Sequence, residues 1–321
     1  MNKNIFARWL RKRLVRIFIP RSMRLKMDAK KQAVRLARIK EEIFAFIAKN
    51  PCNDDDITQA LDFLKNNDLG VFPYPFSKKY NPRDVEIIYD KKTSIYYTIE
   101  EGKRLYYKKR QKADTIPSVI TCLRTEQDPE SPHRYISDDF NISEGEIIAD
   151  VGAAEGNFSL SIIENAGHIY LFEGDTDWEF PLKTTFAPWA YKITIVKKFV
   201  SDSLGKNYIT LDDFFKDKTP PTFIKMDTEG FELKILQGAS RIINESNFLR
   251  IAVCAYHRQS DEKNITDWLV RHSMNVTPVP KKMIFIGDTD LSVPYFRRGI
   301  LRATKSASRS INPIPKRRMS A

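Results

Sequence analysis

The amino-acid sequence predicts an α/β fold built around a mostly parallel, Rossmann-like sheet. Two observations predict it: strand-like and helix-like segments alternate from about residue 145 onward, and successive strands end in acidic residues beside turns. Such alternation is typical of a parallel sheet covered by helices on both faces, with ligands at the carboxyl ends of the strands. At 321 residues and 42% hydrophobic content, the chain can form one such domain with an extension.

The expected elements follow the chain in order. Residues 29–68 read as helical, and residues 85–109 as a β-hairpin that turns at Glu101-Gly102. Strands are then expected at 147–151, 168–174, 191–202, 221–227, 249–257, 281–287 and 295–304, and helices at 157–165, 228–238 and about 261–272. We therefore divide the chain into a basic helical N-terminal region (1–69), an accessory β-hairpin and lid segment (70–135), the main domain (136–303) and a basic, disordered C-terminal tail (304–321).

The positive charge of the chain belongs to its two ends. The net charge is +12, but residues 1–50 hold fifteen Lys and Arg against three acids and residues 301–321 hold six against none, so residues 51–300 carry −6. Residues 1–27 mix basic residues with Trp and Phe at roughly helical spacing. Such a helix can bind an anionic membrane surface or pack on the protein itself. In the first case, removing residues 1–27 abolishes binding to anionic vesicles and leaves cofactor binding intact.

The remaining composition favours a cytoplasmic protein that is, at most, peripheral at the inner membrane face. No segment offers the ~18 apolar residues that a membrane span needs, and the amino end lacks the apolar run of a signal peptide. Cys52, Cys122 and Cys254 are far apart and form no CxxC motif. The sequence therefore indicates neither a disulfide framework nor a structural zinc site.

The turn after the first strand of the main domain, DVGAAEG, indicates a cofactor with a positive charge. Its glycines, Gly152 and Gly156, are spaced G-x-x-x-G, which is neither the dinucleotide fingerprint nor a P-loop. Asp150 can accept from an ammonium group, Gly152 and Ala153 let the backbone come close, and the amides near Gly156 and Asn157 can receive a carboxylate. S-adenosylmethionine carries all of these groups.

Two further acids at strand ends extend this prediction. Glu173 lies 23 residues after Asp150, where a carboxylate can accept both ribose hydroxyls, although NAD would use it in the same way. Asp202 ends the third expected strand and could accept from the adenine amino group. Each acid alone could merely cap a helix or turn, but the three in order match the ammonium, ribose and adenine parts of one cofactor.

Several of these segments together resemble a known family. DVGAAEGNFSL, LFEGD, ITLDDFF and FIKMDTEGFELKILQGA are similar to the signature run of FkbM-type class I S-adenosylmethionine-dependent methyltransferases, and EQDPESPHRY, AYHRQSD and YFRRGILRA resemble one subset. The resemblance covers about residues 120–303. Gly174 departs from it, because the family more often has proline there, and the first hundred residues match nothing in it. It implies a seven-stranded sheet with the last strand antiparallel, S-adenosylmethionine as methyl donor and a hydroxyl of a sugar or secondary metabolite as acceptor.

The catalytic candidates follow the fourth and fifth strands of the main domain or precede its first strand. Lys225 lies in a buried strand, and Asp227 could be its partner, either for catalysis or as a structural ion pair. His257 could take the hydroxyl proton, or merely satisfy a local hydrogen bond. His133 and Glu126 are alternative bases if their segment folds over the pocket. Asp227, Glu229 and a nearby acid could hold a metal, but without firm ligand spacing we predict none.

The sequence thus predicts an S-adenosylmethionine-dependent O-methyltransferase acting on a small-molecule or glycan hydroxyl. Two alternatives stay open. A nucleic-acid methyltransferase would use the basic termini. However, DTEG stands where an adenine amino-methylating enzyme would have a D/N-P-P-Y run, and the body of the chain is negative; both observations argue against nucleic acid as a partner. A non-catalytic S-adenosylmethionine-binding module would not need Lys225, Asp227, Glu229 and His257, all of which are present.

Overall fold

A seven-stranded sheet forms the centre of the protein. The computed structural model describes residues 21–287 and 292–306. The strand order is β11-β14-β10-β9-β4-β5-β6, and β14 pairs antiparallel with both neighbours while the other pairs are parallel. The predicted Rossmann-like sheet of seven strands, with the last strand of the chain antiparallel, is confirmed. Its strands are β4 (Ile147–Val151), β5 (His168–Phe172), β6 (Ile193–Val196), β9 (Phe223–Met226), β10 (Phe248–Cys254), β11 (Asn275–Pro278) and β14 (Ile300–Ser306).

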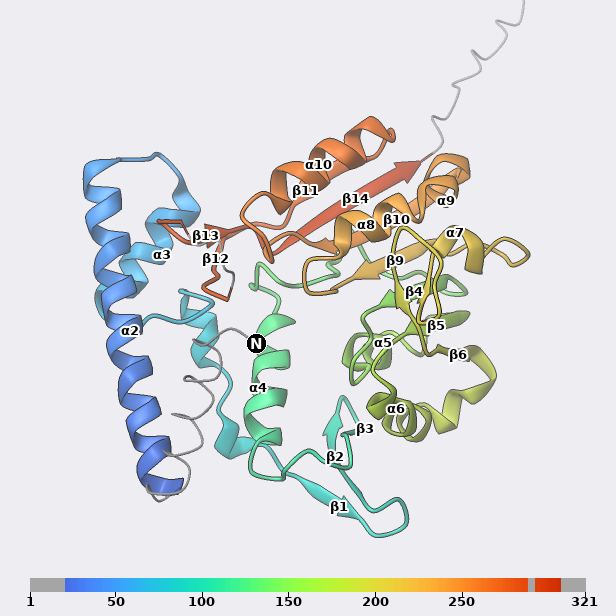
Figure 1. Cartoon of the computed structure of the whole chain (residues 1–321), viewed down its shortest axis with the longest axis horizontal. Coiled ribbons are helices and arrows are strands. Elements are labelled where there is room, and N and C mark those ends of the chain that lie inside the picture. The colour runs from blue at the N-terminus through green and yellow to red at the C-terminus, as the bar shows by residue number, and fades with distance from the viewer. Residues whose placement is uncertain (1–20, 288–291, 307–321) are drawn as a thin grey trace, which may run out of the picture.

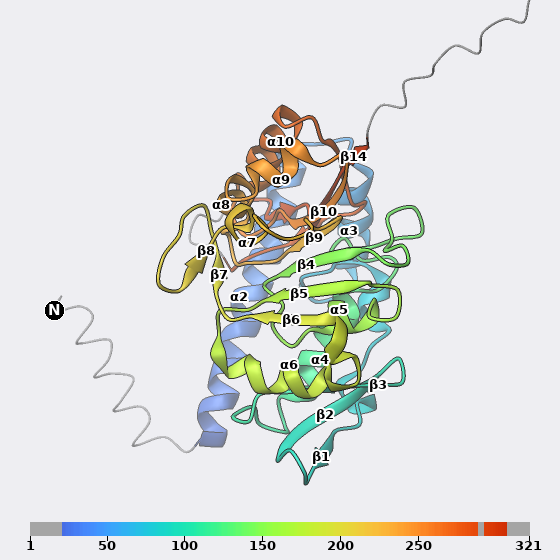
Figure 2. The same cartoon turned by 90° about the vertical axis from the view of Figure 1, so that its right-hand side faces the viewer.

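Helices cover both faces of this sheet and create two cores. On one face, α4 (Ile116–Glu126), α5 (Asn157–Ser161) and α6 (Glu179–Thr185) pack on apolar residues such as Ile148 and Phe223. On the other face, α7 (Leu211–Phe214), α8 (Glu232–Gln237), α9 (Ser240–Glu245) and α10 (Asp261–Arg271) pack on residues such as Ile224 and Val253. Figures 1 and 2 show these two layers. Because β9 is buried at every position, its apolar run has no polar face, as expected for a central parallel strand.

Five predicted elements differ from the structure. The expected strand 191–202 is broken into β6 and β7 (Phe199–Val200), and β7 pairs with β8 (Tyr208–Ile209) outside the main sheet. The helix expected at 228–238 begins only at Glu232, because Glu229 and Gly230 adopt positive φ angles. The helix expected at 157–165 ends at Ser161. Residues 281–287 and 295–304 form the small pair β12 (Met283–Ile284) and β13 (Phe296–Arg297) before β14 begins.

Two further differences are β11, which the sequence did not predict, and β14, which ends later than expected. β11 has a mostly exposed sequence that ends in proline, and it pairs only with β14 at the sheet edge, where proline is tolerated. Its apolar signal is therefore weak. β14 continues to Ser306, so residues 304–306 of the predicted tail are paired with β10. The remainder of that tail lies outside the described residues.

The N-terminal part packs beside the main domain. It comprises α2 (Arg21–Lys49), α3 (Asp55–Lys65) and a three-stranded antiparallel sheet of β1 (Ile88–Asp90), β2 (Ile95–Glu100) and β3 (Lys103–Tyr106). The predicted hairpin turn lies at Glu101 and Gly102, which both have positive φ angles. The apolar stripes of α2 and α3 contact the β12–β13 pair (Figure 1). The division of the chain into four regions stays a prediction.

The predicted amino-terminal membrane-binding segment falls largely outside the described part of the chain, since α2 is described from Arg21. No helix among the described residues is both long and apolar enough to cross a bilayer.

Candidate active site

A cavity of about 420 Å³ opens at the carboxyl ends of β4, β5 and β9. Its walls come from the turn after β4, the end of β5, the β6–β7 break and the loop after β9. It is lined by Val151, Gly152, Ala154, Phe172, Glu173, Gly174, Lys198, Phe199, Val200, Tyr208, Asp227, Thr228, Glu229 and Phe231. The cavity therefore lies where the order of a Rossmann-like sheet reverses, which is the expected place for a ligand.

The two glycines of the first turn, Gly152 and Gly156, have different structural roles. Gly152 has a φ of +76°, and a Cβ there would lie 2.0 Å from the backbone oxygen of Asp227, so only glycine lets the turn touch the loop after β9. Gly156 has a φ of +83°, and a Cβ there would lie 2.8 Å from the Phe186 ring. Gly152 shapes the cavity wall, whereas Gly156 packs the start of α5 against α6.

Glu173 joins the end of β5 to the same turn. Its Oε2 accepts a hydrogen bond from the Ala154 amide at 2.8 Å, and its Oε1 accepts from the Asp175 amide at 2.7 Å. A carboxylate has about four acceptor positions, so Glu173 keeps capacity for two hydroxyls of a ligand. The predicted ribose-binding acid thus lies in the cavity wall.

Four other predicted cofactor residues lie outside the cavity wall. Ala153 is buried in the core, and Gly156 and Asn157 lie at the start of α5, where Asn157 lines a separate cavity. Asp202 is exposed and accepts from the hydroxyls of its own neighbours, Ser201 and Ser203. It follows β7, two residues after Val200, and is not among the residues that line the cavity.

Lys225 pairs with Asp150, not with Asp227 as the sequence suggested. Its Nζ lies 3.1 Å from Asp150 Oδ1 and donates to the Gly152 carbonyl at 2.7 Å, while Ser159 Oγ donates to Asp150 Oδ2 at 2.7 Å. The reason is register, because Asp150 and Lys225 are directly paired on β4 and β9. Burial lowers the pKa of Lys225, but Asp150 and Asp227 outweigh it and raise that pKa.

The buried ion pair of Asp150 and Lys225 stabilises the glycine turn from within the protein. Both oxygens of Asp150 are engaged within the protein, and neither Asp150 nor Lys225 lines the cavity. A direct contact between Asp150 and a ligand would therefore require the pair to open.

Glu155, which lies in the glycine turn, makes the free energy of unfolding of the protein depend on pH. The side chain is buried, and burial raises its pKa from 4.5 to about 7. The folded state thus holds the proton more tightly than the unfolded state, so this group lowers the free energy of unfolding as pH rises from 4.5 to 7, by about 3 kcal/mol. Glu155→Gln should remove that loss.

Urea unfolding of wild type and Glu155→Gln at pH 5 and pH 8 measures this effect. We expect the variant to gain about 3 kcal/mol relative to wild type between the two pH values. An equal change in both proteins would show that Glu155 ionises normally, and the exposed Glu164→Gln serves as the control.

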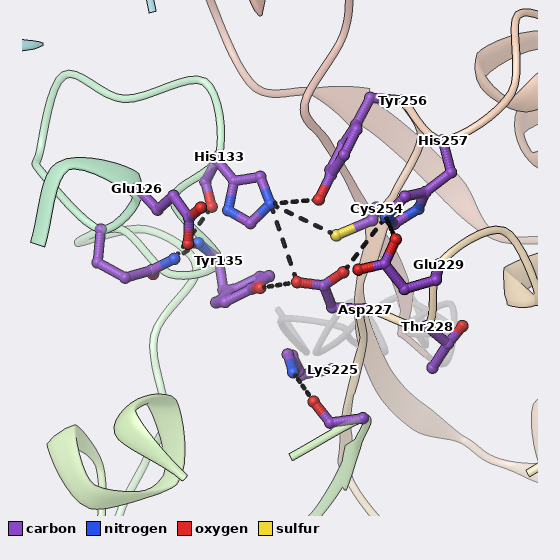
Figure 3. A network of polar contacts seen from close by, with 12 residues as sticks. Glu126, His133, Tyr135, Lys225, Asp227, Thr228, Glu229, Cys254, Tyr256 and His257 are labelled. Atoms are coloured by element: carbon purple, nitrogen blue, oxygen red, sulfur yellow. Dashed lines mark hydrogen bonds and ion pairs between the residues drawn. The ribbon is translucent and has the colours of Figure 1, made fainter. Parts of the chain in front are cut away.

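A polar cluster surrounds Asp227 at one side of the cavity (Figure 3). Tyr135 Oη donates to Asp227 Oδ2 at 2.7 Å, and His133 Nε2 lies 3.9 Å from the same oxygen. His257 Nε2 lies 3.7 Å from Asp227 Oδ1. Although burial raises the pKa of Asp227, Lys225, the two histidines and Tyr135 together lower it. Asp227 is therefore an ionised carboxylate, and 24% of its side chain is exposed.

Glu232 holds His257 in place, and the sequence analysis missed it. Glu232 Oε1 lies 3.0 Å from His257 Nδ1 and also accepts from the Thr228 amide, the Thr228 hydroxyl and the Gly230 amide. Burial lowers the pKa of His257, but Glu232, Asp227 and Glu229 outweigh it and raise that pKa. Glu232 is the second acid of the E-G-x-E run, which was the sequence signal that could have identified it. An acid at this position is also common as the first residue of a helix, so the run alone does not indicate a functional role.

The segment before the main domain supplies the other side of the cluster. His133 Nε2 lies 3.2 Å from Tyr256 Oη and 3.7 Å from Cys254 Sγ. The predicted lid segment therefore places His133 beside Asp227. Glu126 does not line the cavity. Its carboxylate accepts a hydrogen bond from Cys122 Sγ at 3.3 Å, and burial raises the pKa of Glu126.

The matched family model is described as the methyltransferase FkbM domain, and the match spans residues 165–275. Comparison with curated proteins gave no match. A solved methyltransferase FkbM from Methylobacillus flagellatus KT is 20% identical with a TM-score of 0.43, and the alignment covers 60% of this chain and 55% of that one. A precorrin-6y C5,15-methyltransferase from Geobacter metallireducens GS-15 is 13% identical with a TM-score of 0.36, and the alignment covers 52% of this chain and 84% of that one. An rRNA methylase from Streptococcus thermophilus is 9% identical with a TM-score of 0.36, and the alignment covers 52% of this chain and 89% of that one.

The strand order and the cavity at its reversal point define a Rossmann-like protein with the sheet of class I methyltransferases. Residues 165–275 match the methyltransferase FkbM domain, which confirms the resemblance read from the motifs. The chain spans 55% of the length of the Methylobacillus protein.

Proposed function

We propose that this methyltransferase uses S-adenosylmethionine to methylate a hydroxyl of a sugar, or of another glycan or secondary-metabolite precursor. One observation carries the proposal: a single cavity is lined by Glu173 beside the glycine turn and by Asp227 within the Tyr135 and histidine cluster. A nucleoside held at Glu173 and an acceptor hydroxyl held at Asp227 would meet in the same space.

The residues of the cavity fit this cofactor. Gly152 leaves the backbone without a side chain, and Glu173 has acceptor capacity for ribose hydroxyls. Phe172, Phe199 and Phe231 give apolar surface for an adenine ring. Asp227 and Glu229 add two carboxylates, which suit a ligand whose ammonium and sulfonium groups are positive.

The chain itself must position the acceptor oxygen and take its proton. When bound, the cofactor supplies a methyl group that is already a strong electrophile. Asp227 is the group best placed to receive the proton, because it lines the cavity and Tyr135 fixes its Oδ2. The hydroxyl becomes acidic as its new bond to carbon forms, so a carboxylate of lowered pKa is a sufficient base. The assignment of His257 or His133 as the base stays a prediction.

The two alternatives differ in what they methylate. A nucleic-acid methyltransferase would bind phosphates through the basic termini, most of which lie outside the described residues, and a binding module would methylate nothing. Cytoplasmic location and contact of residues 1–27 with a membrane are likewise proposals.

Transfer of a labelled methyl group tests the proposed function. Purified protein is incubated with methyl-labelled S-adenosylmethionine and, separately, with lipid-linked glycans, nucleotide sugars or total RNA and DNA. We expect label in a glycan or sugar fraction as an alkali-stable methyl ether. Label confined to nucleic acid would overturn the proposal in favour of the first alternative.

A further inference from the structure

The two ring nitrogens of His257 have unequal surroundings. Nδ1 faces Glu232 Oε1 at 3.0 Å. Glu232 is almost fully buried, and that oxygen is also fixed by Thr228 and Gly230. A carboxylate oxygen at this distance favours the imidazole tautomer that carries its hydrogen on Nδ1. Nε2 is then the nitrogen whose lone pair is free for another electrophile.

Two carboxylates lie close to this nitrogen. Both ring nitrogens of His257 are buried without a hydrogen bond among the described residues, and Nδ1 has only the close Glu232 contact. Nε2 lies 3.7 Å from Asp227 Oδ1 and 3.8 Å from Glu229 Oε2. These separations are too long for N–H···O hydrogen bonds. They approach the ~3 to 3.7 Å expected between two ligands that share one divalent cation through bonds of about 2.1 Å.

The surroundings of these three side chains support a cation. Tyr135 fixes the other oxygen of Asp227, and Glu232 fixes the other nitrogen of His257, as outer partners commonly do for metal ligands. Glu229 is 91% exposed at its side chain and lines the cavity, so it is free to close onto an ion.

We propose that His257 Nε2, Asp227 and Glu229 bind one divalent transition-metal ion at the wall of the cavity, with Glu232 as the positioning residue. A mixed imidazole and carboxylate set favours Mn²⁺, Fe²⁺, Co²⁺ or Zn²⁺ over Mg²⁺ and Ca²⁺. If the proposed function holds, the ion's open positions take the acceptor oxygen, so acceptors with two adjacent oxygens are the preferred class. His257 is then a ligand. Asp227 would bind the ion through Oδ1, so the proton would go to Oδ2, the oxygen that Tyr135 contacts.

Binding of Mn²⁺ to the purified full chain, without cofactor, tests the site. We expect one saturable site per chain by calorimetry, and an electron spin echo signature of a coordinated imidazole nitrogen. His257→Gln should remove that signature, and Glu229→Gln should weaken binding at least tenfold. Glu229 is so exposed that its substitution should leave the fold intact, which thermal unfolding verifies.

Two controls separate this site from others. Glu164→Gln removes an exposed acid elsewhere and should change nothing. Cys254→Ser removes the thiol of the neighbouring group formed by His133, Asp227 and Cys254, and should leave Mn²⁺ binding unchanged. Absence of saturable binding of both Mn²⁺ and Zn²⁺ at millimolar concentration, or binding that survives His257→Gln, would overturn the proposal. Because cofactor is absent, neither outcome depends on the methyltransferase assignment.

Discussion

Asp227→Asn should reduce methyl transfer by about 10²- to 10³-fold, the range of a lost proton acceptor. The amide has the same size, and Tyr135 Oη can still donate to its oxygen. The fold and the cavity should therefore persist, and cofactor affinity should change by no more than a few fold. The turnover number and the cofactor dissociation constant, measured on the same preparation, give both quantities.

Tyr135→Phe is the matched control for this prediction. It removes only the hydrogen bond that fixes Asp227 Oδ2 and leaves the carboxylate in the cavity wall. We expect a loss of about tenfold, because a misoriented base still accepts a proton. An Asp227→Asn enzyme with the wild-type turnover number would show that the proton leaves by another route.

The largest effect on stability should come from Lys225→Met. This substitution leaves Asp150 as a fully buried carboxylate without its cation. Breaking a buried pair on one side costs about 3–5 kcal/mol, so the thermal midpoint should fall by about 10 °C. Calorimetric unfolding measures both quantities.

The double variant Asp150→Asn with Lys225→Met separates lost charge from lost packing. With no uncompensated charge left, it should be more stable than Lys225→Met alone, although the Ser159 contact is altered. A Lys225→Met protein within about 1 kcal/mol of wild type would mean that Asp150 takes up a proton or finds another partner at little cost.

Local sequence patterns were enough to predict which strand ends form the walls of the site. The glycine turn, Glu173 and Asp227 each stand at the end of an apolar strand, and parallel strands end at one edge of the sheet. Periodicity alone therefore places them together. Asp202 follows the same logic, but it lies after a break at Val196 that the apolar pattern does not reveal, and it does not line the cavity.

The remaining contacts depend on which strands are neighbours. Asp150 and Lys225 are 75 positions apart, and only the pairing of β4 with β9 shows that they are partners. Glu232 was missed because its role comes from the positive φ angles of Glu229 and Gly230, which fold the loop back onto its carboxylate. Tyr135 reaches Asp227 from another segment altogether. Such contacts are set by tertiary packing, which local patterns do not encode.

The most direct test of the account is calorimetric titration of S-adenosylhomocysteine into wild type and Glu173→Ala in one buffer. We predict saturable binding of one molecule per wild-type chain and at least tenfold weaker binding in the variant, because the variant loses the carboxylate that lines the cavity beside Ala154. The exposed Glu164→Gln should bind as wild type does. No binding to wild type at millimolar ligand, or equal affinity in Glu173→Ala, would contradict the assignment of this cavity to the cofactor.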